Sequence, residues 1–165
     1  MALLLTLWLS LFPPDGTHLA HLYHYDLTPS QASEHIATAR LAAALTGTDY
    51  GALLYIAWHE SRFRPGTVTP EPGGKVSCGV MTPVPQRSCP RRASLLDQYR
   101  AGGEHLATWY RACGGHAYCA LIGYAGGFAL IRACRRGPVM VREGVDACGT
   151  AWLYMNGARR MRRIT

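Results

Sequence analysis

Residues 64–92 contain six prolines and four glycines, and no other feature limits the fold of this chain as strongly. Both residue types interrupt helices and central strands, so we expect a long loop or a short irregular hairpin here. Loops of this length inside a compact domain tend to be functional. The segment is therefore a candidate for part of a binding or catalytic site.

Helical patterns lie on both sides of this segment. Apolar residues recur at helical spacing, and Thr28 and Thr48 or Asp49 precede two of the patterns as capping residues. The predicted fold class is mainly α, as a single domain with the long irregular loop or short hairpin between its helices. The expected helices span about 28–47, 49–62, 95–112 and 117–134, with a last helical stretch from Pro138.

The chain of 165 residues is long enough for one hydrophobic core, and no internal repeat divides it. We place this domain at 28–165, preceded by an N-terminal apolar segment at 1–27. Residues 2–12 are too few to span a bilayer as a helix. They resemble a signal-peptide core, although no basic residue precedes them and no clear cleavage site follows. The alternative is a buried helix, or a segment that docks on a partner protein or a membrane.

Six cysteines in an even count, with no Cys-x-x-Cys pair, favour disulfides over zinc. Six cysteines allow 15 pairings. We predict the sequential pairing because each bond would then close a short loop that contains glycine or proline. The alternative is a set of buried, reduced thiols. Disulfides would place the protein in an oxidising, extracytoplasmic compartment. The predicted pairs are Cys78–Cys89, Cys113–Cys119 and Cys134–Cys148.

The formal net charge of +7 suggests an anionic partner, which could be nucleic acid, an acidic membrane face or the bacterial cell wall. The basic tail at 159–163 is interpreted as a solvated helix end, and the alternative is a grip on an anionic polymer. The chain lacks a phosphate-binding glycine loop and a zinc-finger pattern. Nucleic acid is therefore the least favoured of these partners.

Histidines at spacing three precede the first predicted helix, and such spacing could line one helical face with metal ligands. Structural zinc sites usually have tighter ligand pairs, so we interpret this stretch as an amphipathic packing surface. No metal and no cofactor are expected. The residues concerned are His18, His21, His24 and Asp26.

Glu60 follows the apolar run 52–58 at the end of a predicted helix. Partial burial of a carboxyl group raises its pKa, because desolvation disfavours the charged form. A carboxylic acid that stays protonated near neutral pH can donate a proton to a glycosidic oxygen. Glu60 is therefore a candidate general acid, and the alternative is a solvated glutamate at a helix end.

Three motifs follow one another over roughly residues 40–130. They are Glu60-Ser61-x-Phe63-x-Pro65, then Ser77-x-Gly79-Val80-Met81, then Gly123-Tyr124-Ala125-Gly126-Gly127. In this order and spacing they resemble the signature of the lysozyme-like soluble lytic transglycosylases. Two positions depart from the pattern of that family. Thr82 stands where the family usually has Gln, and Ala125 stands where it usually has Asn.

The resemblance implies a lysozyme-like fold and cleavage of the β-1,4 bond between N-acetylmuramic acid (MurNAc) and N-acetylglucosamine (GlcNAc) in peptidoglycan. In that family a single glutamate, here Glu60, acts as acid and then as base while the 6-hydroxyl of the muramic sugar closes an anhydro ring. Tyr124 would hydrogen-bond near Glu60 or to the N-acetyl group, and Ser61 would orient the loop or the carboxylate. The sugar cleft would be lined by Ser77, Gly79, Val80 and Met81.

Most glycosidases use two carboxylates. Glu71 is the nearest second candidate in the sequence, and we interpret it as a surface loop charge. The lack of an evident partner for Glu60 favours a transglycosylase over a hydrolytic lysozyme. A non-catalytic protein that binds the cell wall or forms part of a virion is the other alternative, because of the two departures from the family pattern.

Overall fold

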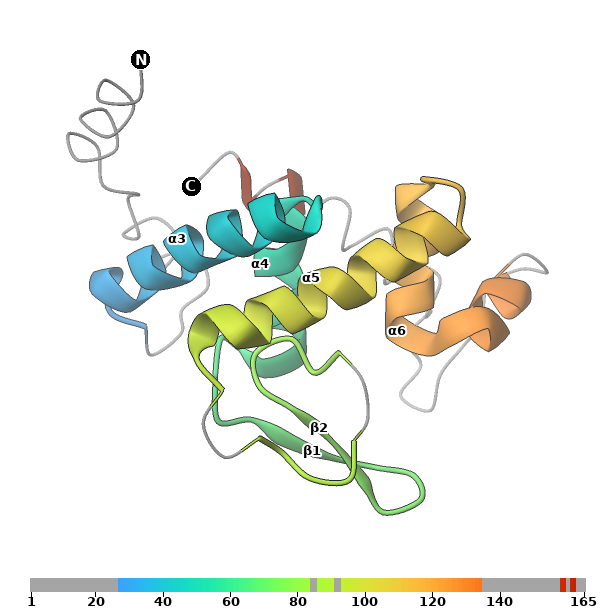
Figure 1. Ribbon diagram of the computed structural model, residues 1–165, viewed down its shortest axis with the longest axis horizontal. Helices are drawn as coiled ribbons and strands as arrows, with labels where there is room; N and C mark the ends of the chain where they lie inside the picture. Colours follow the sequence, from blue (N-terminus) through green and yellow to red (C-terminus); the bar gives the residue numbers. More distant parts are fainter. Residues whose placement is uncertain (1–26, 84–85, 91–92, 135–157, 160, 163–165) are drawn as a thin grey trace.

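The computed structural model describes residues 27–83, 86–90, 93–134, 158–159 and 161–162. These residues form a mainly helical fold with one antiparallel hairpin, which confirms the predicted fold class (Figure 1). The N-terminal segment, the histidine-rich stretch and the helix predicted from Pro138 lie wholly or mostly outside the described residues. The elements are α3 (Pro29–Thr46), α4 (Tyr50–Ser61), β1 (Val68–Glu71), β2 (Lys75–Cys78), α5 (Leu95–Ala112) and α6 (Ala117–Cys134).

Local capping interactions begin and end the first two helices where the sequence predicts. The Thr28 hydroxyl accepts a hydrogen bond from Gln31 N, and the Gln31 side chain accepts one from Thr28 N, which forms a capping box at the start of α3. Gly47 ends α3 in the left-handed conformation, with a φ of 67°. Asp49 caps α4 by accepting from Gly51 N at 2.8 Å.

The core lies between α3, α4 and α5, and α3 runs alongside α5 in Figure 1. Ile36, Leu53 and Leu106, one from each helix, are completely buried. Residues 158–159 and 161–162 add to this core near the start of α4, where Ala158 and Met161 are buried. Arg162 forms an ion pair with Asp49, so part of the basic tail has a structural partner.

The hairpin β1–β2 lies beside α5 and confirms the expectation of a short hairpin between the helices (Figure 1). Glu71 pairs with Lys75 next to its turn, in which Gly73 and Gly74 both have positive φ. A single bridge between Val76 and Gln86 continues the pairing beyond β2. The described residues between this bridge and α5, 87–90 and 93–94, form no helix or strand.

Gly126 and Gly127 interrupt α6, because both have non-helical backbone angles. The φ of Gly127 is 66° and its ψ is −166°, a combination that essentially only glycine adopts. The sequence predicted a continuous helix here, and the structure instead has two helical pieces joined at this pair. By length and composition α6 is apolar enough to cross a membrane, but one third of it is buried inside the fold.

Two of the three predicted disulfides are confirmed. Cys78 bonds to Cys89 and Cys113 bonds to Cys119, with Cα atoms 5.6 and 5.8 Å apart. Cys134 is also disulfide-bonded, and its predicted partner Cys148 lies outside the described residues. Disulfides of this kind are typical of proteins in oxidising compartments.

Candidate functional site

Glu60, near the end of α4, lines a cavity of about 350 Å³. The cavity brings together parts of all three sequence motifs, which are far apart along the chain. Its walls come from α4, both strands of the hairpin, the loop after β2, α5 and the kink of α6. The lining residues are Glu60, Glu71, Ser77, Thr82, Pro83, His105, Trp109, Gly123, Tyr124, Ala125, Gly126 and Gly127.

The Glu60 carboxylate is partly buried, with 26% of its side chain exposed. Thr82 Oγ1 donates a hydrogen bond to Glu60 Oε2 at 2.9 Å. On the other side, His59 Nδ1 lies 3.7 Å from Glu60 Oε1, which is an ion pair when His59 is protonated. The carboxylate is therefore held in one orientation at the cavity wall.

Thr82 is a site residue that the sequence did not identify, beyond its departure from the family pattern. Its backbone φ is 40°, which is unusual for a β-branched residue. Such strain at a cavity wall persists only where surrounding contacts hold it. One feature of the sequence could have identified it. Thr82 places a hydroxyl directly after the second motif, where the family usually has a glutamine that can also form hydrogen bonds.

Tyr124 lies close to Glu60, as predicted, but its hydroxyl has a backbone partner. Tyr124 OH donates to the carbonyl oxygen of Met81 at 2.6 Å. Burial, and to a smaller extent the negative charge of Glu60, raise the pKa of Tyr124 well above its usual value. The phenol therefore stays neutral and ties α6 to the loop after β2.

Ser61 lies behind the cavity rather than in its wall. The Ser61 hydroxyl is 2.9 Å from the carbonyl oxygens of both Ala57 and Val80, and the side chain is buried. This contact joins the end of α4 to the loop after β2. It agrees with the predicted role of Ser61 in orienting the loop.

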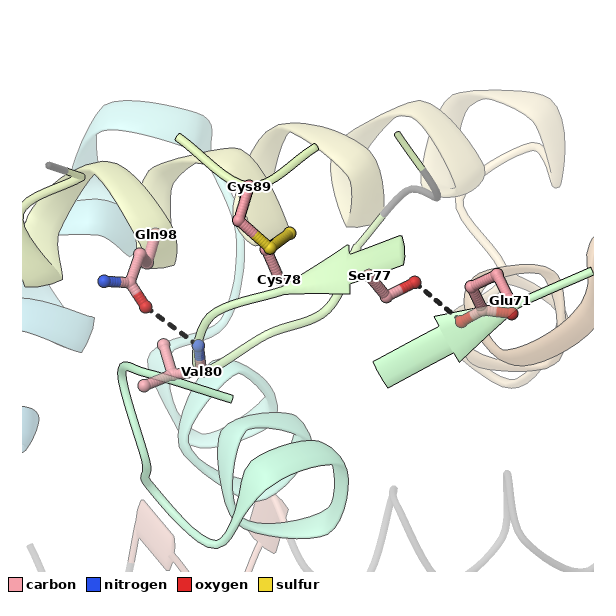
Figure 2. The surroundings of a disulfide bond; sticks show 6 residues. All are labelled: Glu71, Ser77, Cys78, Val80, Cys89 and Gln98. Carbon is pink, nitrogen blue, oxygen red and sulfur yellow. Dashed lines mark hydrogen bonds between the residues drawn. A yellow bond between two sulfur atoms is a disulfide. The ribbon is translucent and has the colours of Figure 1, made fainter. Parts of the chain in front are cut away.

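The residues Gly79, Val80 and Met81 form the core of this loop, and none of them is among the described residues that line the Glu60 cavity. Val80 and Met81 are completely buried. The Val80 N–H donates to Gln98 Oε1 at 2.9 Å, as Figure 2 shows. The carbonyl oxygen of Val80 accepts from Ser61, and the carbonyl oxygen of Met81 accepts from Tyr124. These backbone groups therefore hold the loop in place, and their contact with a sugar stays a prediction.

Ser77 and Glu71 both line the cavity, and their side chains are hydrogen-bonded to each other. Ser77 Oγ donates to Glu71 Oε1 at 2.7 Å, from the second strand of the hairpin to the first (Figure 2). Ser77 is only 2% exposed, and Glu71 is partly buried. The interpretation of Glu71 as a surface loop charge is therefore wrong, because folding of the hairpin turns this carboxylate toward the cavity that contains Glu60.

Aromatic side chains also line the cavity. Trp109 from α5 contacts Phe128 from α6, with ring centroids 4.9 Å apart, and its Nε1 donates to His105 Nε2 at 3.2 Å. Gly123 lets this ring approach, because a Cβ there would overlap the Trp109 side chain. Trp109 falls within the helix predicted over 95–112, and nothing local in the sequence indicates that its ring reaches α6.

A second cavity of about 1050 Å³ adjoins the first and shares Pro83 and His105 with it. It lies between the disulfide Cys78–Cys89 and the face of α5 that carries Gln98 and Arg100. Gly79, predicted to contact the substrate, lines this second cavity. Together the two cavities give space for more than one unit of an extended ligand.

Comparison of the chain with protein families, with curated proteins and with solved structures finds no match. A function can therefore rest only on the chemistry of this cavity and on the three-motif resemblance.

Proposed function

We propose that this protein cleaves the β-1,4 bond between MurNAc and GlcNAc in peptidoglycan, with Glu60 as the general acid. The observation that supports this most is the cavity itself. It joins a partly buried carboxylate at a helix end with Ser77 from the second motif, with Thr82 directly after that motif, and with Tyr124 from the third. Such an arrangement suits proton donation to a departing sugar oxygen.

The chemistry would begin with the protonated Glu60. It gives its proton to the glycosidic oxygen while positive charge develops on the muramic ring. The ionised Glu60 then accepts a hydrogen bond from Thr82, which stabilises the charge that it has gained. The neutral Tyr124 keeps the neighbouring loop in position through Met81.

Two routes can complete the reaction. In the lytic transglycosylase route, which the resemblance predicts, Glu60 takes a proton from the 6-hydroxyl of MurNAc and an anhydro ring closes. This route needs one carboxylate. In the hydrolytic route a second carboxylate activates water, and the presence of Glu71 in the same cavity favours this second candidate.

The net charge and the disulfides support a protein that acts on the bacterial cell wall. A net charge of +7 suits an anionic polymer, and disulfides suit an extracytoplasmic place. We therefore propose peptidoglycan strands as the partner, and a periplasmic, secreted or virion-associated location. A wall-binding protein without catalysis is the competing function.

The test is digestion of purified peptidoglycan, with mass analysis of the soluble products. Wild type and the control Glu34→Gln, an exposed position on α3, should release muropeptides at the same rate. Glu60→Gln keeps the size of the side chain but removes the titrating proton. It should lower the rate by at least ~100-fold, the usual minimum for a general acid, with an unchanged melting temperature.

Two results would contradict this function. Activity of Glu60→Gln within about tenfold of wild type, equivalent to ~1.4 kcal/mol of barrier, would exclude Glu60 as the acid. Wall binding without products from any of the three proteins would favour the non-catalytic alternative.

A further inference from the structure

The hairpin places the Glu71 and Ser77 side chains on one face. Glu71 pairs with Lys75, and Ser77 follows Lys75 by two residues on β2, so the three side chains point the same way. Diagonal neighbours of this kind are within reach of each other. The hydrogen bond from Ser77 to Glu71 is the result, and it lies at the cavity wall.

The partner of Glu71 has a chemical consequence. Lys75 is the cross-strand neighbour of Glu71, yet in the described part of the chain Glu71 has no ion pair and its side chain is bonded to neutral Ser77. The buried serine hydroxyl orients the carboxylate by donating a hydrogen bond to one of its two oxygens.

The two carboxylates are thus held separately in one small cavity. Glu60 comes from the end of α4 and is bonded to Thr82, whereas Glu71 comes from the end of β1 and is bonded to Ser77. Most hydrolytic glycosidases pair one carboxyl group as acid with a second carboxylate, which in inverting enzymes activates water on the opposite face of the sugar. The lytic transglycosylase route needs only one carboxylate.

We propose that Glu71 is the general base of this site and that the enzyme hydrolyses the glycan strand. The proposal rests on the function proposed above and decides between its two routes. Water forms a bond to the anomeric carbon of MurNAc and gives one proton to Glu71. At the same time the glycosidic bond breaks, and Glu60 gives its proton to the oxygen that stays with GlcNAc. The products are a reducing MurNAc and a GlcNAc with a free 4-hydroxyl, and solvent returns the proton from Glu71 to Glu60.

Digestion in ¹⁸O-labelled water, with prompt borohydride reduction of the new ends so that their anomeric oxygen cannot exchange with solvent, tests the origin of the new oxygen. Wild type should yield reducing ends that carry one ¹⁸O atom, because the oxygen comes from water. Anhydro ends form without water and carry no label. The ratio of labelled reducing ends to unlabelled anhydro ends therefore measures the route directly.

Substitution of the base supplies the second readout. Glu71→Gln should lower the formation of labelled reducing ends by at least ~100-fold relative to the control Glu34→Gln. Ser77→Ala removes only the orienting hydrogen bond and should cause a smaller loss. Glu60→Gln should lower the formation of products of both kinds by at least ~100-fold.

A chemical rescue separates catalysis from folding. Azide is already an anion and needs no base, so added azide should restore bond cleavage by Glu71→Ala and form MurNAc azide at the anomeric carbon. The same addition should not restore Glu60→Ala to a comparable extent, because the leaving oxygen still lacks its acid. A role of Glu71 in folding alone would give no rescue.

The outcomes keep this proposal apart from the proposed function. Unlabelled anhydro ends from wild type would leave the cleavage function standing and would overturn Glu71 as the base. Labelled reducing ends formed by Glu71→Gln within about threefold of Glu34→Gln would overturn it as well. No cleavage by wild type would overturn both.

Discussion

Two regions of this protein are stabilised in different ways. The helical frame, which we define as α3, α4 and α5, is held by apolar side chains such as Ile36, Leu53 and Leu106 that are completely buried. The hairpin–loop segment, which we define as the described part of residues 64–93, also buries Val80 and Met81, but it adds directed contacts. These are the disulfide Cys78–Cys89 and the hydrogen bonds to the backbone of Val80 and Met81.

The difference matches what each region contributes. Apolar burial is roughly proportional to area and has no direction, so it stabilises the frame without specifying atomic positions at the site. Hydrogen bonds and a disulfide have preferred distances and angles, so they specify where the cavity walls lie. Glu60 and its partner Thr82 lie where these two regions meet, and Glu71 lies within the hairpin–loop segment.

The largest effect on stability is expected in the frame. Leu53→Ala removes a completely buried side chain and should lower the free energy of unfolding by about 2–5 kcal/mol. Leu45 on α3 is 59% exposed, so the matched variant Leu45→Ala should change the free energy of unfolding by less than ~0.5 kcal/mol. Urea unfolding measures both. Equal losses would contradict the assignment of Leu53 to the core.

Acid should weaken the frame through His35. Burial lowers the pKa of His35 from 6.5 to about 4, and Nδ1 lies 2.9 Å from Tyr99 OH. Between these two pH values the unfolded chain binds the proton and the folded chain does not, so stability falls as pH falls. The contribution lost by pH 4 is about 3 kcal/mol.

His35→Gln lacks this titration. Between pH 7 and pH 4 the free energy of unfolding of wild type should therefore fall by about 3 kcal/mol more than that of His35→Gln. Urea unfolding at several pH values measures the change. A constant difference would mean that His35 titrates alike in both states.

Removal of the two described disulfides, one at a time, should have similar effects on stability but different effects on cleavage. They span 11 and 6 residues, so chain entropy predicts a similar loss of about 2–3 kcal/mol when either is removed. Only the Cys78→Ala/Cys89→Ala variant should also lose cleavage, since its bond holds the hairpin–loop segment. The Cys113→Ala/Cys119→Ala variant is the control. Equal loss of cleavage in both would contradict the division between the two regions.

The smallest effect is expected at Tyr124. Tyr124→Phe removes one buried hydrogen bond and leaves the Met81 carbonyl without it, which should cost about 1–1.5 kcal/mol of stability. Cleavage should slow only modestly, because the loop shifts while Glu60 remains. A loss of cleavage above ~100-fold with unchanged stability would instead indicate that Tyr124 acts on the substrate itself.

Most of the frame could be predicted because its signals are local. Thr28 and Asp49 cap helices through hydrogen bonds to residues two or three positions away, and Gly47 ends α3 by its own backbone preference. The disulfide pairs were predictable for a related reason, since each closes a short loop. The interruption of α6 was missed because a glycine pair is tolerated inside a helix until packing bends it.

The sequence by itself determined the helices, the place of the hairpin, two of the disulfides and the choice of Glu60 as a candidate acid. Only the tertiary structure decided which side chains share the cavity with Glu60. Thr82 lies 22 residues from Glu60, and Tyr124 lies 43 residues from Met81, so no local pattern records these contacts. Glu71 shows the same limit, because the strand register and the packing of the hairpin, rather than its neighbours in sequence, turn its carboxylate toward the cavity.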